Sequence, residues 1–273
     1  MKILRITVIV IFVAVTAVFL RTYIGEKLNY DETIPVITVD SDIIEVSFRA
    51  GDEELKQGVT ATDGKDGDIT DKVIVESVSA FIEKGVCKVN YAVCDSDNHV
   101  STASRKVRYT DYTSPEFFIT DSTCFSLYDS IDVSQRIHCK DCIEGNIDRK
   151  MILTSPDYVA ASTGIFTIEA NVTNNKGDTS TLSIPLYVED RPAYAPTIKL
   201  REYLVYLEQG GKLNPKKYLS SAADTEGVNL TSKVRIENKL DPSKEGMQSI
   251  HYYVTDDRGV EGHTVLNVYV TGK

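Results

Sequence analysis

The longest run of apolar residues in the chain lies at its N-terminus. Ile6–Leu20 contains no charged residue, and apolar residues continue past Arg21 to Ile24. A helix over Ile3–Ile24 is long enough to cross a hydrocarbon core of roughly 30 Å, with Arg5 and Arg21 reaching its two faces. The sequence therefore predicts an uncleaved signal-anchor helix, with the membrane as the partner of Ile6–Leu20.

Charge on either side of this helix predicts its orientation. Lys2 and Arg5 are the first basic residues, so the positive-inside rule places the C-terminus outside the cell. We therefore expect a single-pass protein of the cell membrane whose C-terminus is extracellular. Val15-Thr16-Ala17 has the small residues of a cleavage site, so secretion after signal-peptide cleavage stays open as the alternative.

After this helix the hydrophobic pattern changes from continuous to alternating. Between Val86 and Val93 every second residue from Cys87 onward is apolar, and Lys88 and Asn90 lie between them. The segments around Ile168 and Ile250 alternate in the same way. Alternation with a period of two is typical of a strand that has one face on a core and one in water.

One unit of about 80 residues occurs three times, which indicates a string of small domains. Each copy opens on proline after an acidic linker, carries an acidic-Gly turn, and closes with two strands joined by a polar turn. Short strands separated by polar turns predict an antiparallel β-sandwich in each copy. The predicted organisation is a cytoplasmic end and anchor at 1–30, followed by first, second and third repeats at 31–111, 112–190 and 191–273.

The first repeat resembles a known family of domains. Gly58–Asp63 followed by Asp66–Val73 is similar to the signature of bacterial immunoglobulin-like surface domains, which include a domain of unknown function in Gram-positive exported proteins. Gly211–Tyr218 resembles the same family, whereas Cys139–Cys142 interrupts its pattern in the second repeat. The resemblance implies an all-β fold of three tandem Ig-like sandwiches and a role in surface display, adhesion or spacing. It brings no catalytic residues.

Composition narrows the function further. The chain has 30 Lys and Arg against 40 Asp and Glu, a formal net charge of −10, which argues against nucleic acid as a partner. It has no phosphate loop, nucleophile elbow or metalloprotease helix motif. We therefore expect a non-catalytic spacer, adhesion or ligand-presenting module for an unknown protein or glycan. The alternative is an accessory subunit of an envelope assembly or export complex.

An acidic loop in the first repeat is a candidate calcium site. Asp63, Asp66, Asp68 and Asp71 cluster there, and carboxylate oxygens are ligands that calcium prefers. The spacing differs from an EF-hand loop, because Ile74 stands at the twelfth position. The favoured interpretation is a turn in which Asp side chains bond the backbone, so no cofactor is expected unless calcium binds.

The five cysteines do not share positions among the repeats, which argues against a disulfide framework. One alternative is a disulfide bridge from Cys124 to Cys139 or Cys142, and the other is that the cysteines are free thiols. Repeat alignment places Cys139 opposite Ala61, a small buried position. The segment His138–Cys142 could begin a zinc site, but it lacks a second ligand pair, so structural cysteines are the favoured interpretation.

Tyrosines crowd the third repeat and are the last candidates. Exposed Tyr203, Tyr206 and Tyr253 could contact a protein or a sugar. The alternative is that about half of these tyrosines face the core, as the strand pattern indicates for Tyr252. The absence of Trp weakens the case for a sugar platform.

Overall fold

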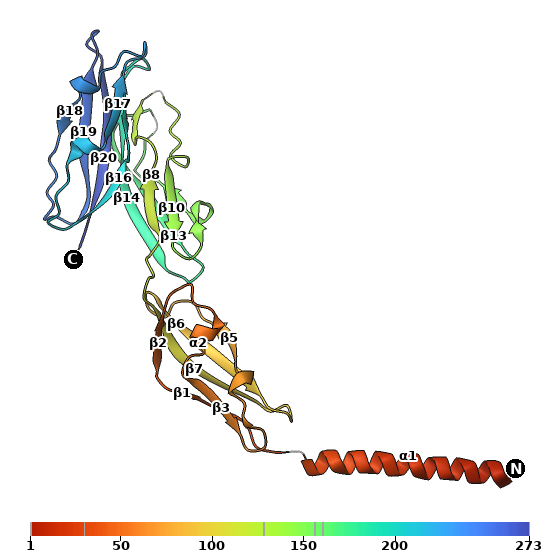
Figure 1. Cartoon of the computed structure of the whole chain (residues 1–273). Coiled ribbons are helices and arrows are strands. Elements are labelled where there is room, and N and C mark those ends of the chain that lie inside the picture. Colours follow the sequence, from red (N-terminus) through yellow and green to blue (C-terminus); the bar gives the residue numbers. More distant parts are fainter. Residues whose placement is uncertain (1, 30, 128, 156, 160, 273) are drawn as a thin grey trace. The chain divides into compact units, whose positions relative to one another are not determined.

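The computed structural model describes residues 2–29, 31–127, 129–155, 157–159 and 161–272. It is mostly β-sheet with an N-terminal apolar helix (Figure 1), so the predicted all-β class is confirmed. The chain divides into two compact units, residues 1–111 and 112–273. The second and third repeats share one of these units, and the predicted boundary between them at 190 stays a prediction.

Helix α1 (Lys2–Asn29), the red ribbon in Figure 1, contains a stretch suited to cross a membrane. Arg5–Gly25 has a mean hydropathy of 2.2 over 21 residues, and its apolar side chains are exposed, Phe12 by 69%. Apolar side chains in such numbers are stable only in a lipid or other apolar surrounding. A signal sequence near the N-terminus shares these features, so both expectations for this segment stay open.

The first unit builds one sandwich from two sheets. Strands β1 (Val36–Val39), β3 (Val59–Asp63) and β4 (Gly67–Asp68) form one sheet in the order β1-β3-β4. The second sheet has the order β2-β7-β6-β5, with strands β2 (Ile43–Val46), β5 (Ile74–Val78), β6 (Val86–Cys94) and β7 (Val100–Tyr109). The short helix α2 (Asp52–Leu55) connects β2 to β3. All pairs are antiparallel except β2 with β7, because the chain crosses between sheets after β1.

The core of the first unit follows the alternation in the sequence. Val89, Tyr91 and Val93 on β6 are at most 2% exposed, whereas Lys88 faces outward. Tyr91 also donates its hydroxyl hydrogen to the Leu55 carbonyl oxygen at 2.5 Å. The half-buried strand predicted over this segment is therefore confirmed.

Arg105 is a buried cation in this core, with 4% of the residue exposed. Its guanidinium donates to the Tyr91 hydroxyl at 2.9 Å, to the Leu55 carbonyl at 3.0 Å and to the Gln57 carbonyl. Asp40 pairs with it at 3.1 Å. Because buried carbonyls need donors, Arg105 ties the α2 segment to strand β7.

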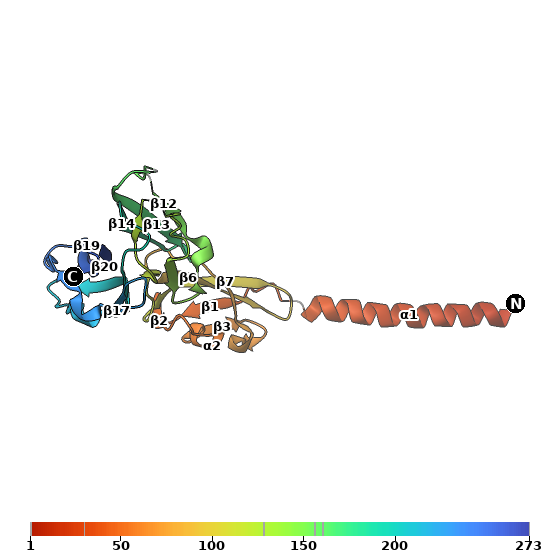
Figure 2. The same cartoon turned by 90° about the horizontal axis from the view of Figure 1, so that it is seen from above.

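The second unit contains two sandwiches. In the second repeat, strands β8 (Glu116–Ile119), β10 (Ile137–Asp141) and β11 (Gly145–Asn146) form the sheet β11-β10-β8. Strands β9 (Cys124–Ser126), β12 (Ile152–Thr154), β13 (Gly164–Thr173) and β14 (Thr179–Glu189) form the sheet β12-β13-β14-β9. Figure 2 shows β12, β13 and β14 side by side.

The third repeat follows the same plan. Strands β15 (Thr197–Leu200) and β17 (Leu219–Ala223) form a two-stranded sheet. Strands β16 (Leu204–Glu208), β18 (Arg235–Glu237), β19 (Gly246–Thr255) and β20 (Glu261–Thr271) form the sheet β16-β20-β19-β18. Each repeat has one parallel pair, here β16 with β20 and in the second repeat β9 with β14.

The same pattern of side-chain to backbone hydrogen bonds closes the hairpin in every repeat. The side chains of Asp95, Asn174 and Asp256 each accept backbone N–H groups two and four residues further on, at 2.8–3.0 Å. A residue with positive φ follows in each turn, namely Asn98, Gly177 and Gly259. These Asx turns explain why the polar turn recurs in the sequence.

A second recurring hydrogen bond follows the acidic-Gly turn, where the chain enters a short 3-10 helix. The Thr70 hydroxyl accepts from the Ala61 N–H at 3.0 Å, and the Asp148 carboxylate accepts from the Cys139 N–H at 2.7 Å. The third repeat uses Thr231 in the same way. Ala61 and Cys139 are both fully buried, which confirms the repeat alignment that placed them opposite each other.

The two sandwiches of the second unit share one core. Strand β20 is buried from Gly262 to Val268 without interruption, so both of its faces are covered. Leu266 and Val268 lie in the main core, while Val265 packs with Cys124 and Tyr187 of the second repeat. A strand covered on both faces loses the alternation of exposed and buried residues. The second and third repeats are therefore one packed body.

Replacing Arg105 by Leu should destabilise the first unit. The buried Leu55 and Gln57 carbonyls would lose their donor, and we expect a loss of about 3 kcal/mol in the free energy of unfolding. Denaturant titration of the full chain, followed by tyrosine fluorescence because the chain lacks Trp, measures this loss. The control is Arg108→Leu, whose side chain is 54% exposed. Equal losses in both variants would contradict the assigned role.

Candidate functional site

The acidic loop of the first repeat forms turns with its own backbone. Asp63 accepts from the N–H groups of Lys65 and Asp66 at 3.0 and 2.9 Å, and Asp68 accepts from Thr70 at 2.9 Å. The interpretation of this loop as a backbone-bonded turn is therefore confirmed.

The remaining acids of this loop have protein partners or face the surface. Asp66 accepts from the Ser96 hydroxyl and N–H, both at 2.7 Å, and these bonds lower the pKa of Asp66. Lys72 lies 3.3 Å from the same carboxylate, and Asp71 is exposed. Among the described residues, no group of three or more His, Cys, Asp or Glu side chains is arranged to hold a metal ion.

The two cysteines of His138–Cys142 lie in different surroundings. Cys139 is fully buried, and burial raises its pKa to about 12. Cys142 is partly exposed and donates its thiol hydrogen to the Thr113 carbonyl at 3.1 Å. His138 pairs with Asp148 at 2.9 Å. The segment serves the turn and the core, as the structural interpretation expected.

All five cysteines lie in the described part of the chain, and no disulfide joins any two of them. The bridge from Cys124 to Cys139 or Cys142, which the sequence left open, does not form. Cys139 packs in the main core, whereas Cys124 belongs to a separate cluster with Tyr187 and Val265. Burial raises the pKa of Cys124 to about 12, so this thiol stays protonated at neutral pH.

The three candidate tyrosines have different environments. Tyr203 is only 4% exposed, and its hydroxyl accepts from the Leu200 N–H at 3.1 Å, so its expected surface position is wrong. Tyr252 is fully buried, as the strand pattern predicted. Tyr206 and Tyr253 are partly exposed, and neither is free of protein contacts. Their roles in binding stay predictions.

Tyr253 belongs to a polar cluster where the two sandwiches of the second unit meet. Glu189 lies 2.6 Å from His263 Nδ1, and His263 Nε2 lies 3.0 Å from His251 Nδ1. The Tyr253 ring stacks on His263 with centroids 4.5 Å apart, and Arg235 lies 4.5 Å over Tyr253.

This cluster, Glu189–His263–His251, joins the last strand of the second repeat to β19 and β20. Burial and the neighbouring His263 lower the pKa of His251. Burial raises the pKa of Glu189, but the hydrogen bond and charge of His263 outweigh it and the net pKa is lowered. The Tyr187 ring lies edge-on to both imidazoles, at 5.4 and 5.9 Å. The arrangement favours a neutral His251 and an ionised Glu189, which suits a packing junction.

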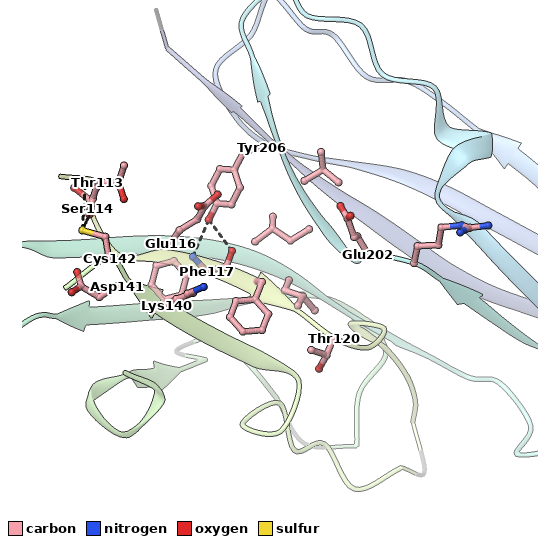
Figure 3. Close-up of a pocket in the computed structure, with 15 residues that line it drawn as sticks. Thr113, Ser114, Glu116, Phe117, Thr120, Lys140, Asp141, Cys142, Glu202 and Tyr206 are labelled. Atoms are coloured by element: carbon pink, nitrogen blue, oxygen red, sulfur yellow. Dashed lines mark hydrogen bonds between the residues drawn. The ribbon is translucent and has the colours of Figure 1, made fainter. Parts of the chain in front are cut away.

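A groove of about 800 Å³ separates strands β8 and β16 on the surface of the second unit. Both strands lie at the edges of their sheets. Figure 3 shows Thr113, Ser114 and Cys142 toward one end of the groove, and Thr120 and Glu202 toward the other. An open hollow of this size is large enough for a segment of a polymeric ligand.

Tyr206 crosses the groove and closes the exposed edge of β8. Its hydroxyl donates to the Phe117 carbonyl and accepts from the Phe117 N–H, both at 3.2 Å (Figure 3). This satisfies an edge that would otherwise pair with another strand. Burial raises the pKa of Tyr206, which keeps the hydroxyl protonated for this double contact.

The groove combines apolar and charged surfaces. Phe118 is 42% exposed and stacks on His138 at 5.2 Å, and Val205 on β16 is partly buried beside the groove. Charged residues of both signs complete the lining, namely Glu116, Lys140, Asp141, Arg201 and Glu202. Such a mixture suits contact with a polar polymer that has apolar faces, such as a peptide or a sugar chain.

The sequence interpretation missed the groove and the histidine cluster, because both depend on the packing of two repeats. A signal was present in the closing strands. The run Val265–Tyr269 is nearly continuous in apolar residues, whereas its counterpart Ser101–Val107 in the first repeat alternates with polar residues. A half-buried strand needs only one apolar face, so the continuous run indicated a second covering surface.

The chain is similar to known proteins only over part of their length and at low sequence identity. No family model matches the chain. A pesticidal crystal protein, Cry22Aa of Bacillus thuringiensis, is 26% identical over 141 residues, which cover 50% of this chain and 19% of that protein. The chain therefore spans about a fifth of that curated relative.

Similar solved structures are β-rich proteins at low identity. The M60 catalytic domain with two CBM51 domains of Clostridium perfringens ZmpB is 16% identical, with a TM-score of 0.25, covering 89% of this chain and 31% of that one. Drosophila N-cadherin EC1-4 is 11% identical, with a TM-score of 0.25, covering 88% of this chain and 67% of that one.

The histidine cluster predicts that the second unit loses stability in acid. The pKa of His251 is lowered in the folded protein and returns toward its ordinary value of 6.5 on unfolding. The unfolded state then binds more protons, so the free energy of unfolding is highest above about pH 6.5 and falls as pH decreases through the lowered pKa. Denaturation of the full chain at pH values from about 8 to 5 measures this fall.

His251→Gln removes the titrating group and should flatten this pH dependence. His99→Gln, in the first unit, serves as the matched control and should leave the fall unchanged in the second unit. An equally steep fall in the His251 variant would contradict the assignment.

Proposed function

We propose that the protein is an exported, membrane-anchored, non-catalytic binding module that presents the groove between β8 and β16 to a protein or glycan. The observation that carries this proposal is the groove itself, which lies open on a unit whose two sandwiches share one core. A shared core holds β8 and β16 in a fixed relation, so the groove is ready for a ligand without reorganisation.

The N-terminal helix supports the proposed anchor. Its apolar side chains are exposed along the stretch Arg5–Gly25, which matches the thickness of a bilayer. Lys2 and Arg5 precede it and favour an extracellular C-terminus. The first repeat follows this helix in the chain and precedes the second unit, so its proposed role is that of a spacer.

The polar side chains support a non-catalytic role. Asp63 and Asp68 bond turns, Glu189 and the two histidines hold the junction, and the Cys124 and Cys139 thiols stay protonated. Each of these groups has a structural partner that accounts for its position. This favours a binding protein over an enzyme.

The anchor and its orientation can be tested in intact cells. We expect the full chain to keep its N-terminus, to stay with membranes after alkaline washing, and to lose a tag placed after Lys273 when an external protease is added. Ile6–Leu20 exchanged for an unrelated anchor should leave these results and ligand binding unchanged. A mature N-terminus beyond Ala17 would show secretion instead, and loss of function after the exchange would favour an accessory subunit of an envelope complex.

The groove can be tested with a photoreactive benzophenone side chain at Phe118. We expect irradiation of intact cells to give one discrete adduct at this position, and Val205→Asp to weaken it about tenfold, because a charge would replace apolar contact. The control position is Ile165, which is 67% exposed on β13 and outside the groove lining. The proposal fails if both positions give the same adducts. Protease or glycosidase digestion of the adduct then assigns its class.

A further inference from the structure

A second hollow, of about 350 Å³, opens where the second and third repeats meet, and we call it the junction pocket. It is separate from the groove between β8 and β16. Its lining includes three cationic side chains, Arg136, Arg191 and Lys199, together with the hydroxyl-bearing residues Ser122 and Thr264. The lining also contains two carboxylates, Asp121 and Asp129, so cations outnumber anions there by one in a chain whose formal net charge is −10.

Arg136 is held in place but is only weakly compensated. Its guanidinium lies 4.1 Å from the Phe125 ring centroid and donates to the Ser122 carbonyl. The carboxylate that pairs with it belongs to Asp121, at 4.0 Å, and that side chain is 59% exposed while Arg136 is 27% exposed. The planar guanidinium of Arg136 therefore has N–H donors that these two contacts do not use.

Arg191, like Arg136, is held in place and is only weakly compensated by a carboxylate. Its side chain is 18% exposed and donates to the His263 carbonyl at 2.8 Å. The Glu189 carboxylate lies 3.8 Å away, but it also accepts from His263 at 2.6 Å. A partly buried cation usually has a close carboxylate of its own, and Arg191 shares one with His263.

Hydrogen bonds bring the two guanidinium groups to the same pocket. The carbonyl of Ser122 holds Arg136, and its hydroxyl accepts from the Thr264 hydroxyl at 2.8 Å. Thr264 follows His263, whose carbonyl holds Arg191. Contacts with backbone carbonyls therefore fix both guanidinium groups at the junction pocket. The exposed Lys199 adds a third positive charge.

The acids near this pocket are engaged with the backbone. Asp121 accepts from the Ser122 N–H at 2.7 Å, and Asp129 accepts from the Ser126 N–H at 2.8 Å. Both acids line the pocket, and Asp121 lies 4.0 Å from the Arg136 guanidinium. Arg136 and Arg191 both line the pocket, and their paired carboxylates lie 4.0 and 3.8 Å away, beyond hydrogen-bond distance, so both guanidinium groups keep N–H donors for a ligand.

We propose that the junction pocket binds an oxyanion, the carboxylate or phosphate group of an acidic ligand. Paired guanidinium forks bind both groups through parallel N–H···O bonds, which a lone ammonium cannot match. The Ser122 hydroxyl accepts from Thr264 and from the Cys124 N–H, so its own hydrogen is left to donate to the oxyanion. The volume suits one small unit such as a sugar acid or a phosphoryl group. This site does not depend on the proposed role of the groove.

Calorimetric titration of the full chain in lipid nanodiscs tests the proposal with three probes: inorganic phosphate, galacturonate and neutral galactose. We expect the phosphate or the galacturonate to bind and galactose not to bind at the same concentration. Binding of both anions would show a general oxyanion site, and binding of one would identify its source. Failure of both anions, or equal binding of galactose, would overturn the proposal.

Variants connect binding to the pocket. Arg136→Gln and Arg191→Gln should each weaken anion binding about tenfold, because each removes charge-assisted hydrogen bonds. Lys199→Gln, at an exposed position, should weaken it about twofold to threefold, since it removes only a solvated charge. The matched control is Arg149→Gln, an exposed arginine outside the pocket, which should have no effect. Equal affinities in all variants would refute the site.

A second measurement avoids the risk that a variant fails to fold. Phenylglyoxal modifies accessible arginines, and mass spectrometry locates the adducts in the unmutated chain. The bound anion should slow modification of Arg136 and Arg191 at least threefold and leave Arg149 unchanged, because the anion covers only the two forks in the pocket. Uniform protection of all three arginines, or protection of none, would contradict the assignment.

Discussion

The structure of the second unit depends on the burial of strand β20 on both faces. Leu266 and Val268 fill the sandwich of the third repeat, while His263 and Val265 contact the second repeat. Removing apolar surface from water is worth roughly 25 cal/mol per Å², so burial on two sides makes this strand part of the core that the two repeats share. Gly262 lets the segment at Pro196, just before β15, lie against β20, since a Cβ there would lie 2.0 Å from the Pro196 carbonyl oxygen.

This packing creates both the groove between β8 and β16 and the junction pocket. The edges of β8 and β16 are held apart by a fixed distance, and the Tyr206 hydroxyl spans it by bonding Phe117. At the junction pocket, the linker after β14 places Arg191 against β20. A hinge between the repeats would have left neither hollow with a constant shape, so rigidity here serves recognition.

The repeats also show how one plan tolerates different chemistry. Thr70 and Thr231 bond the strand before the 3-10 helix with a hydroxyl, and Asp148 does so with a carboxylate that also contacts His138. The His138–Cys142 segment that resembled the start of a zinc site is thus a local variant of a turn. Its Cys139 fills the space that Ala61 fills in the first repeat.

The apolar helix, the alternating strands such as Val86–Cys94, and the Asx turns at Asp95 and its counterparts could all be predicted from the order of residues. These features arise from interactions between residues that are close in the chain, so their periods and turn residues predict them. The burial of Tyr203, and the position of Arg136 and Arg191 at one pocket, follow from long-range packing and could not be predicted in this way. The alternation of residues in a strand shows that one face is apolar, but it does not show which other part of the chain packs on that face. That packing partner lies far away in the sequence.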